Sequence, residues 1–358
     1  MAWKSYAVSA KTWKRLAQLD AKSFPWKRVI NNGGTGSAVF ELADESVAEV
    51  LGLYDLYPGQ FLVVLEWDGT VVYAGFVEKH RYVRDTLTLT VEHKDIWSLW
   101  EDRKVISDRS PTVAKSKLTF SNLTLSTIAK RIIETVTTGP GFGVPIVFPA
   151  DNPGLSSRTY YGYDLYSAAE ALQELMDQDG GPDIDFHPRW KSDGTLEWQM
   201  RVAGTLTGPE LHYDLTAEDS GARGMWIETD ASQLVTHVYG VGEGTEVDML
   251  VRLSQSSNIG EYPAREATAV YKDVKSGAQL QGLAQEAIRA NNQATRQAGF
   301  EVLAGGEHKV SDIRLGSAVR WNVQRDPYIT NGYRSWNLIQ FSGGLGEWVT
   351  LEFQQKGG

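Results

Sequence analysis

Alternation of apolar and polar residues in the first third of the chain predicts antiparallel β-strands. Two runs rich in β-branched and aromatic residues, Phe61 to Trp67 and Thr70 to Glu78, are joined by Asp68-Gly69, a dipeptide typical of two-residue hairpin turns. In Thr86 to His93, leucine and valine alternate with threonine and glutamate, so one face of this strand would be buried and the other would face water. The pattern indicates an antiparallel sheet or a small barrel.

Helical spacing of apolar residues marks the middle of the chain. A first stripe is formed by Ile128, Ile132, Ile133 and Val136, and a second by Leu165, Ala168, Ala169, Leu172, Leu175 and Met176. Asp164 is the expected N-cap of the second helix. A hairpin across Ser192-Asp193-Gly194 follows, and Asp44 to Tyr54 is expected as a further short helix.

Strand patterns return after Gln233 and are interrupted by one long helix predicted from Leu280 to Asn291. The chain is therefore expected to be mainly β with α+β insertions, and to contain two antiparallel β-barrel domains. The expected division is an N-terminal arm over residues 1–25, a first β-barrel domain over 26–105 for which 206–232 is a candidate completing segment, an α+β domain with two helices and a hairpin over 106–205, and a second β-barrel domain over 233–358 with a helical insertion at about 275–305.

The two strand-rich ends of the chain resemble each other. Near the N-terminus, Gly59-Gln60 leads into an apolar strand with a tryptophan, then a hairpin, then Leu87-Thr88-Leu89-Thr90-Val91-Glu92. Near the C-terminus, Gly316-Ser317 leads into Ala318–Trp321, then a long strand, then Val349-Thr350-Leu351-Glu352. Two related β-barrels in one chain would explain this order, and the chance similarity of any two alternating strands is the alternative.

Composition narrows the classes of function. The 358 residues have a formal net charge of −10 and contain no cysteine. The acidic balance argues against a protein that binds nucleic-acid phosphates through bulk charge. The absence of cysteine excludes disulfide scaffolds, zinc-thiolate sites and thiol nucleophiles.

Candidate catalytic or ligand-binding residues are few. Sequence motifs for phosphate loops, zinc proteases, serine hydrolases and calcium loops are absent from the chain. Asp183, Asp185 and His187 would share one face of a strand and form a weak candidate metal site. Arg189 would lie on the same face, where its charge opposes a cation, so the favoured interpretation is a solvated hairpin face. No catalytic residue, cofactor-binding residue or cofactor is therefore predicted.

The tryptophans admit two interpretations. Large aromatic side chains can stack on sugars or anchor a protein interface, but at alternating strand positions core packing is the more economical explanation for most of them. The set is Trp67, Trp97, Trp100, Trp198, Trp226, Trp321, Trp336 and Trp348.

The order of these features resembles the tail-hub or minor tail proteins of long-tailed bacteriophages, especially those of phages that infect actinobacteria. The resemblance is carried by the segment from Trp26 to Phe40, which includes Asn31-Asn32-Gly33-Gly34, by Val63 to Glu78, by Leu89 to Ile96 and by Leu315 to Trp321. It covers nearly the whole chain after Pro25. Many relatives carry an aspartate at the place of Ser317, so the last segment is a looser match.

The resemblance implies a structural virion protein with two tail-tube-like antiparallel β-barrel domains and smaller α/β domains. Such hubs form a homotrimeric ring that matches the six-fold tail tube to the three-fold tip. A distal tail protein or the tail-tube protein would lie above the ring, and a tip or fibre protein below it. DNA would pass through the lumen without specific binding. The resemblance further implies synthesis in the host cytoplasm, location at the virion tail tip, no membrane insertion and no enzymatic activity.

Net charge adds one expectation to this role. Three copies of a chain of net charge −10 would carry −30, so we expect a negatively charged lumen that repels DNA phosphates during ejection.

Two alternative functions remain open at the level of sequence. A carbohydrate-binding tail-tip protein would present exposed tryptophan pairs, and a cell-wall hydrolase would hold two carboxylates or a metal ion in one cleft.

Overall fold

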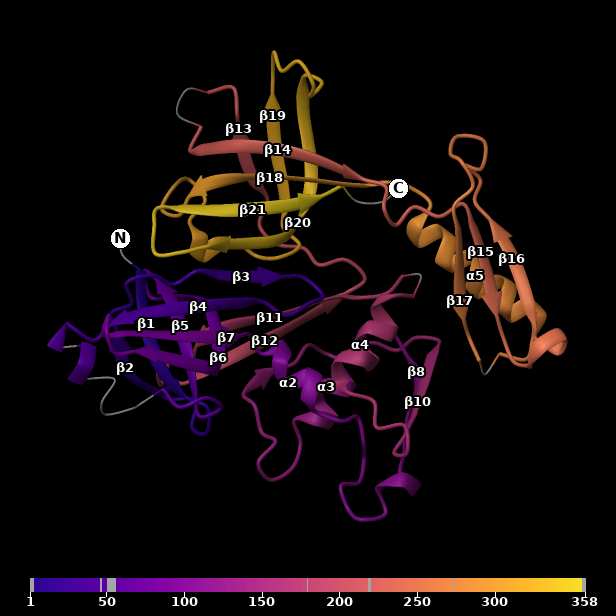
Figure 1. Ribbon diagram of the computed structural model, residues 1–358, viewed down its shortest axis with the longest axis horizontal. Helices are drawn as coiled ribbons and strands as arrows, with labels where there is room; N and C mark the ends of the chain where they lie inside the picture. The colour runs from indigo at the N-terminus through magenta and orange to yellow at the C-terminus, as the bar shows by residue number, and fades with distance from the viewer. Residues whose placement is uncertain are drawn as a thin grey trace. The chain divides into compact units, whose positions relative to one another are not determined.

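The structure is a computed structural model that describes residues 3–45, 47–49, 56–178, 180–217, 220–272 and 274–355. The chain divides into two compact units (Figure 1). The larger comprises Met1–Trp226 and Gly299–Gly358, and the smaller, here called the inserted unit, comprises Ile227–Ala298. Residues 46 and 50–54 of the helix expected at Asp44 to Tyr54 lie outside the described residues.

Seven strands near the N-terminus form the first sheet section, with the order β3-β4-β7-β6-β5-β1-β2 and antiparallel neighbours. The predicted hairpin is confirmed: Asp68 and Gly69 connect β5 to β6 with positive φ angles of 46° and 87°. The strands are β1 (Trp3–Ser9), β2 (Arg15–Leu19), β3 (Trp26–Val29), β4 (Thr35–Glu41), β5 (Phe61–Trp67), β6 (Thr70–Val83) and β7 (Thr88–Lys94).

The prediction of an N-terminal arm over residues 1–25 is wrong, because these residues supply β1 and β2. β1 pairs with β5 along its whole length, and Tyr6 and Val8 are buried. The ring of Trp3 packs edge-on against that of Trp67, with 4.7 Å between centroids. Without β1, the apolar strand β5 would be an open sheet edge, which natural sheets avoid.

Six strands form the second sheet section, with the order β14-β18-β21-β20-β19-β13. Residues 206–232 contribute β13 and β14 to this section, so their expected role in completing the first one is wrong. β13 runs parallel to β19, and the two were not recognised as partners because they lie far apart in sequence. The strands are β13 (Leu211–Asp214), β14 (Ala222–Asp230), β18 (Thr295–Leu303), β19 (Ala318–Val323), β20 (Gly332–Gly343) and β21 (Trp348–Gln354).

The two sections share one strand order, as the similarity between the chain ends predicted. β3, β4, β7, β6, β5 and β1 correspond in turn to β14, β18, β21, β20, β19 and β13, and each set follows the same order along the chain. One difference is that β1 runs antiparallel to β5, whereas β13 runs parallel to β19. The correspondence indicates a duplicated sheet rather than two unrelated sheets.

Register supports the same conclusion. Pairing of β6 with β7 shifts at a bulge just before Lys79, and pairing of β20 with β21 shifts at a bulge just before Gln340. After the bulge, Lys79 lies opposite Glu92 and Gln340 lies opposite Glu352. The sequence comparison matched Leu87 with Val349. The register instead makes Leu89-Thr90-Val91-Glu92 the counterpart of Val349-Thr350-Leu351-Glu352, so the predicted alignment of the last strands is displaced by two residues.

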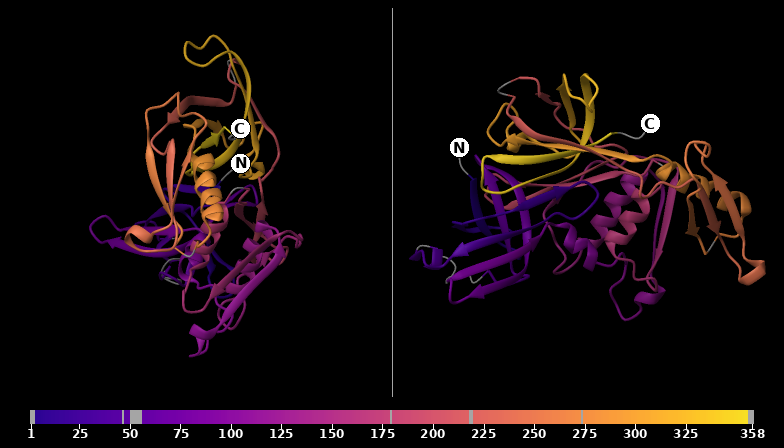
Figure 2. Two further views of the ribbon diagram at one scale, coloured as in Figure 1. Left: turned by 90° about the vertical axis from the view of Figure 1, so that its right-hand side faces the viewer. Right: turned by 45° about the horizontal axis from the view of Figure 1, so that its top comes forward.

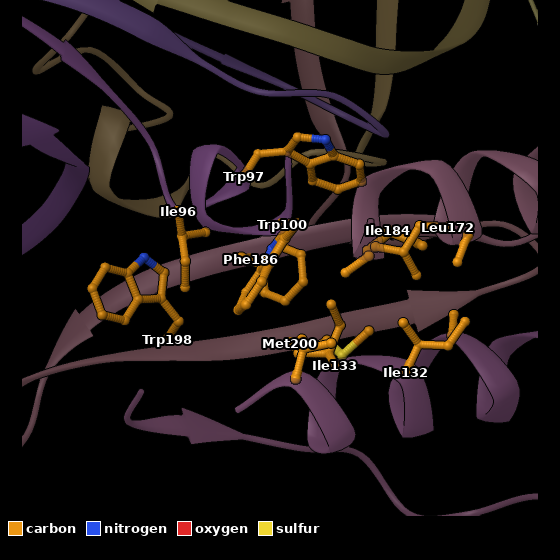
Figure 3. Packing of buried hydrophobic residues seen from close by; sticks show 14 of the residues in the cluster. Ile96, Trp97, Trp100, Ile132, Ile133, Leu172, Ile184, Phe186, Trp198 and Met200 are labelled. Carbon is orange, nitrogen blue, oxygen red and sulfur yellow. The ribbon is translucent and has the colours of Figure 1, made fainter. Parts of the chain in front are cut away.

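The α+β section between the two sheet sections confirms the predicted helices and hairpin. Apolar faces of α3 and α4 pack with strands β11 and β12 around fully buried Trp100 and Trp198 (Figure 3). The N-cap of α4 is Ser167 rather than Asp164, because Ser167 and Glu170 form a reciprocal capping box. The elements are α2 (Trp97–Asp102), η1 (Val113–Lys115), β8 (Lys117–Leu123), α3 (Leu125–Val136), β9 (Ile146–Val147), β10 (Ser156–Tyr161), α4 (Ala168–Met176), β11 (Asp183–Trp190) and β12 (Leu196–Ala203).

The inserted unit is a small sheet covered by one helix (Figure 2). Its strand order is β16-β15-β17, and Val238, Ala284 and Ile288 form its core. It interrupts the connection from β14 to β18, so the expected single barrel domain over 233–358 with an insertion at 275–305 is wrong in its bounds. The elements are β15 (His237–Val241), η2 (Glu246–Asp248), β16 (Val251–Gln255), β17 (Glu266–Val270) and α5 (Gly277–Asn291), and η3 (Val310–Asp312) follows in the larger unit.

Hydrogen bonds between β20 and β3 join the two sections, so that thirteen of the described strands form one sheet (Figure 1). Gln340 to Gly343 of β20 lie opposite Val29 to Trp26 of β3 in antiparallel register. Phe341 packs against the ring of Trp26, with 5.4 Å between centroids.

Candidate functional site

The candidate residues Asp183, Asp185 and His187 lie on β11, as the hairpin pattern predicted. The expectation of a solvated face is wrong, because the side chains of Asp185 and His187 are buried. Two arginines account for this burial. Arg28 on β3 and Arg201 on β12 both form ion pairs with Asp185, on the face of β11 for which the sequence had indicated no partner.

Asp185 forms the centre of a buried ion-pair cluster. One carboxylate oxygen accepts a hydrogen bond from Arg28 at 2.7 Å, and the other accepts from Arg201 at 3.0 Å. Arg28 is itself only 4 % exposed. Both charges of the pair are therefore removed from water, and each guanidinium stabilises the ionised carboxylate.

His187 extends this cluster as a neutral acceptor. Its Nδ1 lies 3.1 Å from Nη1 of Arg28, and because a guanidinium can only donate, the imidazole nitrogen must accept. Burial strongly lowers the pKa of His187, and the positive charges of Arg28 and Arg314 lower it further. The ring is therefore uncharged at neutral pH.

Asp183 forms hydrogen bonds with residues next to the cluster. One of its oxygens accepts from the Asn31 side chain at 3.2 Å, and the other accepts from the backbone N–H of Leu206 at 3.0 Å. Arg201 also donates to the carbonyl of Leu315 at 3.0 Å. The cluster thus connects the first sheet section, the α+β section and the segment that leads into β19.

This arrangement does not suit a cation. The oxygens of Asp185 and Nδ1 of His187 already bind guanidinium groups, whose positive charge repels a metal ion. Within the described ranges, no group of three or more histidine, aspartate or glutamate side chains is placed to hold a metal. Arg189, expected on the same face, instead binds Glu197 at 2.8 Å with a half-exposed side chain.

A second polar group, the partly buried Asp95, was missed in the sequence. Its carboxylate accepts from the backbone N–H of Gly34 at 2.6 Å and from that of Trp97 at 2.9 Å. Burial raises the pKa of Asp95 to about 7. The available signal was an aspartate two residues before an apolar helical turn, a position that often receives backbone N–H groups. Its role is to hold the turn after β3 against α2.

A surface hollow in the α+β section is a place where a substrate could be sought. It has a volume of about 910 Å³, and its lining includes Arg109, Phe120, Arg131, Glu134 and Phe148. Glu134 is the one carboxylate among these lining residues, and it is ion-paired with Lys130 and Arg131. Acid-base hydrolysis of a glycosidic bond uses two carboxyl groups flanking that bond. The hollow therefore does not provide the arrangement that a cell-wall hydrolase needs.

Most of the tryptophans considered above serve the core, as expected. Trp226 and Trp348 are half-buried and the other six are buried. In the part of the chain that the structure describes, the exposed large aromatic side chains are tyrosines. The exposed tryptophan pairs expected of a carbohydrate-binding tip are not found among the described residues.

None of the helices in the described ranges is long and apolar enough to cross a bilayer.

Comparison with known proteins identifies the fold. No protein-family model matches the chain, and no curated protein matches its sequence. Among solved structures, the fold is similar to the 43 kDa tail protein of prophage MuSo2 from Shewanella oneidensis, with a TM-score of 0.60, 12% identity and 98% of each chain covered. It is equally similar to a tail protein from Neisseria meningitidis, with a TM-score of 0.60, 15% identity, and 100% of this chain and 98% of that one covered.

A prophage tail protein from Listeria monocytogenes is also similar, with a TM-score of 0.51, 10% identity, and 99% of this chain and 95% of that one covered. Because the similarity to all three spans nearly the whole length of each chain, the chain as a whole has the fold of these two prophage tail proteins and of the Neisseria meningitidis tail protein.

Proposed function

We propose that the chain is a structural protein of a phage virion and forms the hub at the distal end of the tail. The observation that carries this proposal is the duplicated sheet: two sections with one strand order and a matching bulge stand in a single chain. Similarity of fold to two prophage tail proteins and to a further bacterial tail protein supports it.

Duplication gives the proposed hub its mechanical role. A ring of three chains, each with two tail-tube-like barrels, would present six similar barrels to a six-fold tube and three identical faces to a three-fold tip. Closed rings arise when one head-to-tail contact repeats around an axis. The hub would therefore convert one symmetry into the other without needing a second protein.

The lumen of the proposed ring would let DNA pass without binding it. A net charge of −10 per chain favours a negatively charged channel, since like charges repel the phosphate backbone. The proposed neighbours are a distal tail protein or the tail-tube protein above and a tip or fibre protein below. The proposed role requires no cofactor, no metal ion and no catalysis. The proposed source of the protein is a phage that infects actinobacteria.

The proposal is tested on purified virions. Quantitative mass spectrometry is expected to find three copies of the chain per tail, and gold-labelled antibodies are expected to bind at the tail end distal to the capsid. A copy number of six or more, or labelling along the tube, would refute the hub role. Clearing of a suspension of host cell walls by the purified chain would favour the hydrolase instead.

A further inference from the structure

The contact between the two sheet sections occupies one edge of β20. The first half of β20 pairs with β19, where Ala318 to Val323 lie opposite Asn337 to Gly332. The second half of the same edge, Gln340 to Gly343, pairs with β3. β21 occupies the opposite edge. In the second section, therefore, β3 of the first section continues the pairing that β19 begins.

Among the described residues, the corresponding edge in the first section has no strand partner over its second half, although Gly59 donates to the Val77 carbonyl and the ring of Tyr57 packs edge-on against His80. β6 is the counterpart of β20, and its first half pairs with β5 through Trp67 to Leu62. β7 pairs with the opposite edge as far as Val83. Along the β5 side of Lys79 to Val83, none of the described residues forms a strand pair. By the match of the two bulges, Lys79 to Tyr82 correspond to Gln340 to Gly343.

The strand that would fill this edge is also incompletely paired. β14 is the counterpart of β3, and it ends the sheet with β18 as its neighbour among the described strands. β3 has β4 on one side and β20 on the other. Each section thus carries the same two surfaces, the second half of one edge of its longest strand and a donor strand. Within the chain, β3 fills this half-edge on β20, while the half-edge on β6 and the donor strand β14 are not joined to each other.

The charges of the two unjoined surfaces are complementary. Arg81 and Lys79 are exposed on the second half of β6, and Lys79 is ion-paired with Glu92 on β7, so the proposed contact depends on the charge of Arg81. Glu228 and Asp230 are exposed on β14. Opposite charges facing each other across a strand pair stabilise that pair, whereas two acidic strands would repel.

We propose that β14 of one copy of this chain pairs with Lys79 to Tyr82 of the next copy. This contact rests on the proposed hub function and specifies the interface between neighbouring chains of the ring, here called the seam. The seam repeats between chains the strand pairing, or joint, that β3 and β20 form within a chain. Internal and external joints would then alternate around the ring, and three copies would close it with six similar joints. Sheet continuation of this kind uses main-chain hydrogen bonds for affinity and side chains for register.

The absence of native cysteine allows a direct test by disulfide trapping. Arg81→Cys is combined in turn with Ile227→Cys, Glu228→Cys and Thr229→Cys, a panel that samples three neighbouring registers of β14 against β6. The matched control is Lys27→Cys with Ser342→Cys, two residues directly opposite each other in the internal joint. Each full-length variant is assembled into tails in the host and oxidised, and the products are separated without reductant.

The expected result is that the control pair gives an internal disulfide at monomer mobility, while at least one panel member gives a covalent trimer without free thiols. Single-cysteine variants are expected to stay monomeric. Formation of the control disulfide with no covalent trimer from any panel member would overturn the seam. If the tails still contain three copies of the chain, the hub function survives that failure, whereas tails assembled with the wild-type chain that do not contain it refute the function.

Charge reversal provides a second readout that does not depend on disulfide geometry. Arg81→Glu is expected to reduce incorporation of the chain into tails at least tenfold, and Arg81→Glu with Glu228→Arg is expected to restore it. The matched control is Lys117→Glu on the exposed part of β8 in the α+β section, which should leave incorporation unchanged. Equal incorporation of all these variants would overturn the proposed pairing.

Discussion

Lys79 and Gln340 hold equivalent places in two halves of one chain. Each residue directly follows a bulge in the longest strand of its section, and each binds a glutamate on the next strand. Nζ of Lys79 lies 3.1 Å from Glu92, and Nε2 of Gln340 lies 2.6 Å from Glu352. Bulges fix the register of a strand pair, so two bulges with the same partners point to one ancestral sheet used twice.

The first prediction concerns the buried ion pair that joins the sections. Asp185→Ala is expected to lower the free energy of unfolding by about 3–5 kcal/mol, because it leaves the buried Arg28 and the largely buried Arg201 without their carboxylate. Urea denaturation followed by tryptophan fluorescence measures the change. The matched control on the same strand is Arg189→Ala, whose half-exposed side chain should contribute about 0–1 kcal/mol. Equal effects of the two substitutions would contradict a structural role for the cluster.

The second prediction concerns pH and His93, which is buried beside Tyr73 at 3.0 Å. Burial lowers the pKa of His93 from 6.5 to about 4, so between these values the unfolded chain binds a proton that the folded chain does not. His93 therefore reduces stability as pH falls from 6.5 towards 4, by up to about 3 kcal/mol. His93→Gln is expected to remove this dependence.

The measurement for His93 is the difference in unfolding free energy between the wild type and His93→Gln from pH 7 to pH 4. Asp95, whose pKa is raised to about 7, acts in the opposite direction, since its folded form gains stability as pH falls from 7 to 4. Because Asp95 is present in both proteins, its contribution cancels in the difference. A difference that does not change with pH would show that His93 is accessible to protons in the folded state.

The third prediction concerns the inserted unit. β3 connects to its neighbour β4 by a short turn, whereas the corresponding strands β14 and β18 are connected by the inserted unit. Replacement of residues 231–294 by a tight Asn-Gly turn is therefore expected to leave a folded larger unit. A single cooperative unfolding transition and a compact hydrodynamic radius would confirm this. A collapsed or aggregated product would mean that the larger unit depends on the insertion.

Local features of the fold could be predicted from the sequence because their signals lie within a few residues. The Asp68-Gly69 hairpin needs two residues with positive φ, and the stripe from Ile128 to Val136 needs only helical spacing. The cap of α4 was missed because Asp164 and Ser167 are both good capping residues. Ser167 prevails through its reciprocal bonds with Glu170.

Pairing between distant strands could not be predicted in the same way. Nothing near Trp3 indicates that β1 covers β5, and nothing near Leu211 indicates a parallel partner at Val319. The same limit applies to the site: Asp185 looked solvated because its partner Arg28 comes from a strand far away in the sequence. Residues that are buried by remote partners carry no local signal of burial.

The most direct test of the central claim is a cryo-electron microscopy reconstruction of the tail end, refined without imposed symmetry. The duplicated sheet predicts a ring of three chains in which six similar β-sheet sections surround the channel at intervals of about 60°, with β14 of each chain next to β6 of its neighbour. A ring of six chains, or a ring in which the first and second sheet sections face different directions relative to the channel, would contradict it.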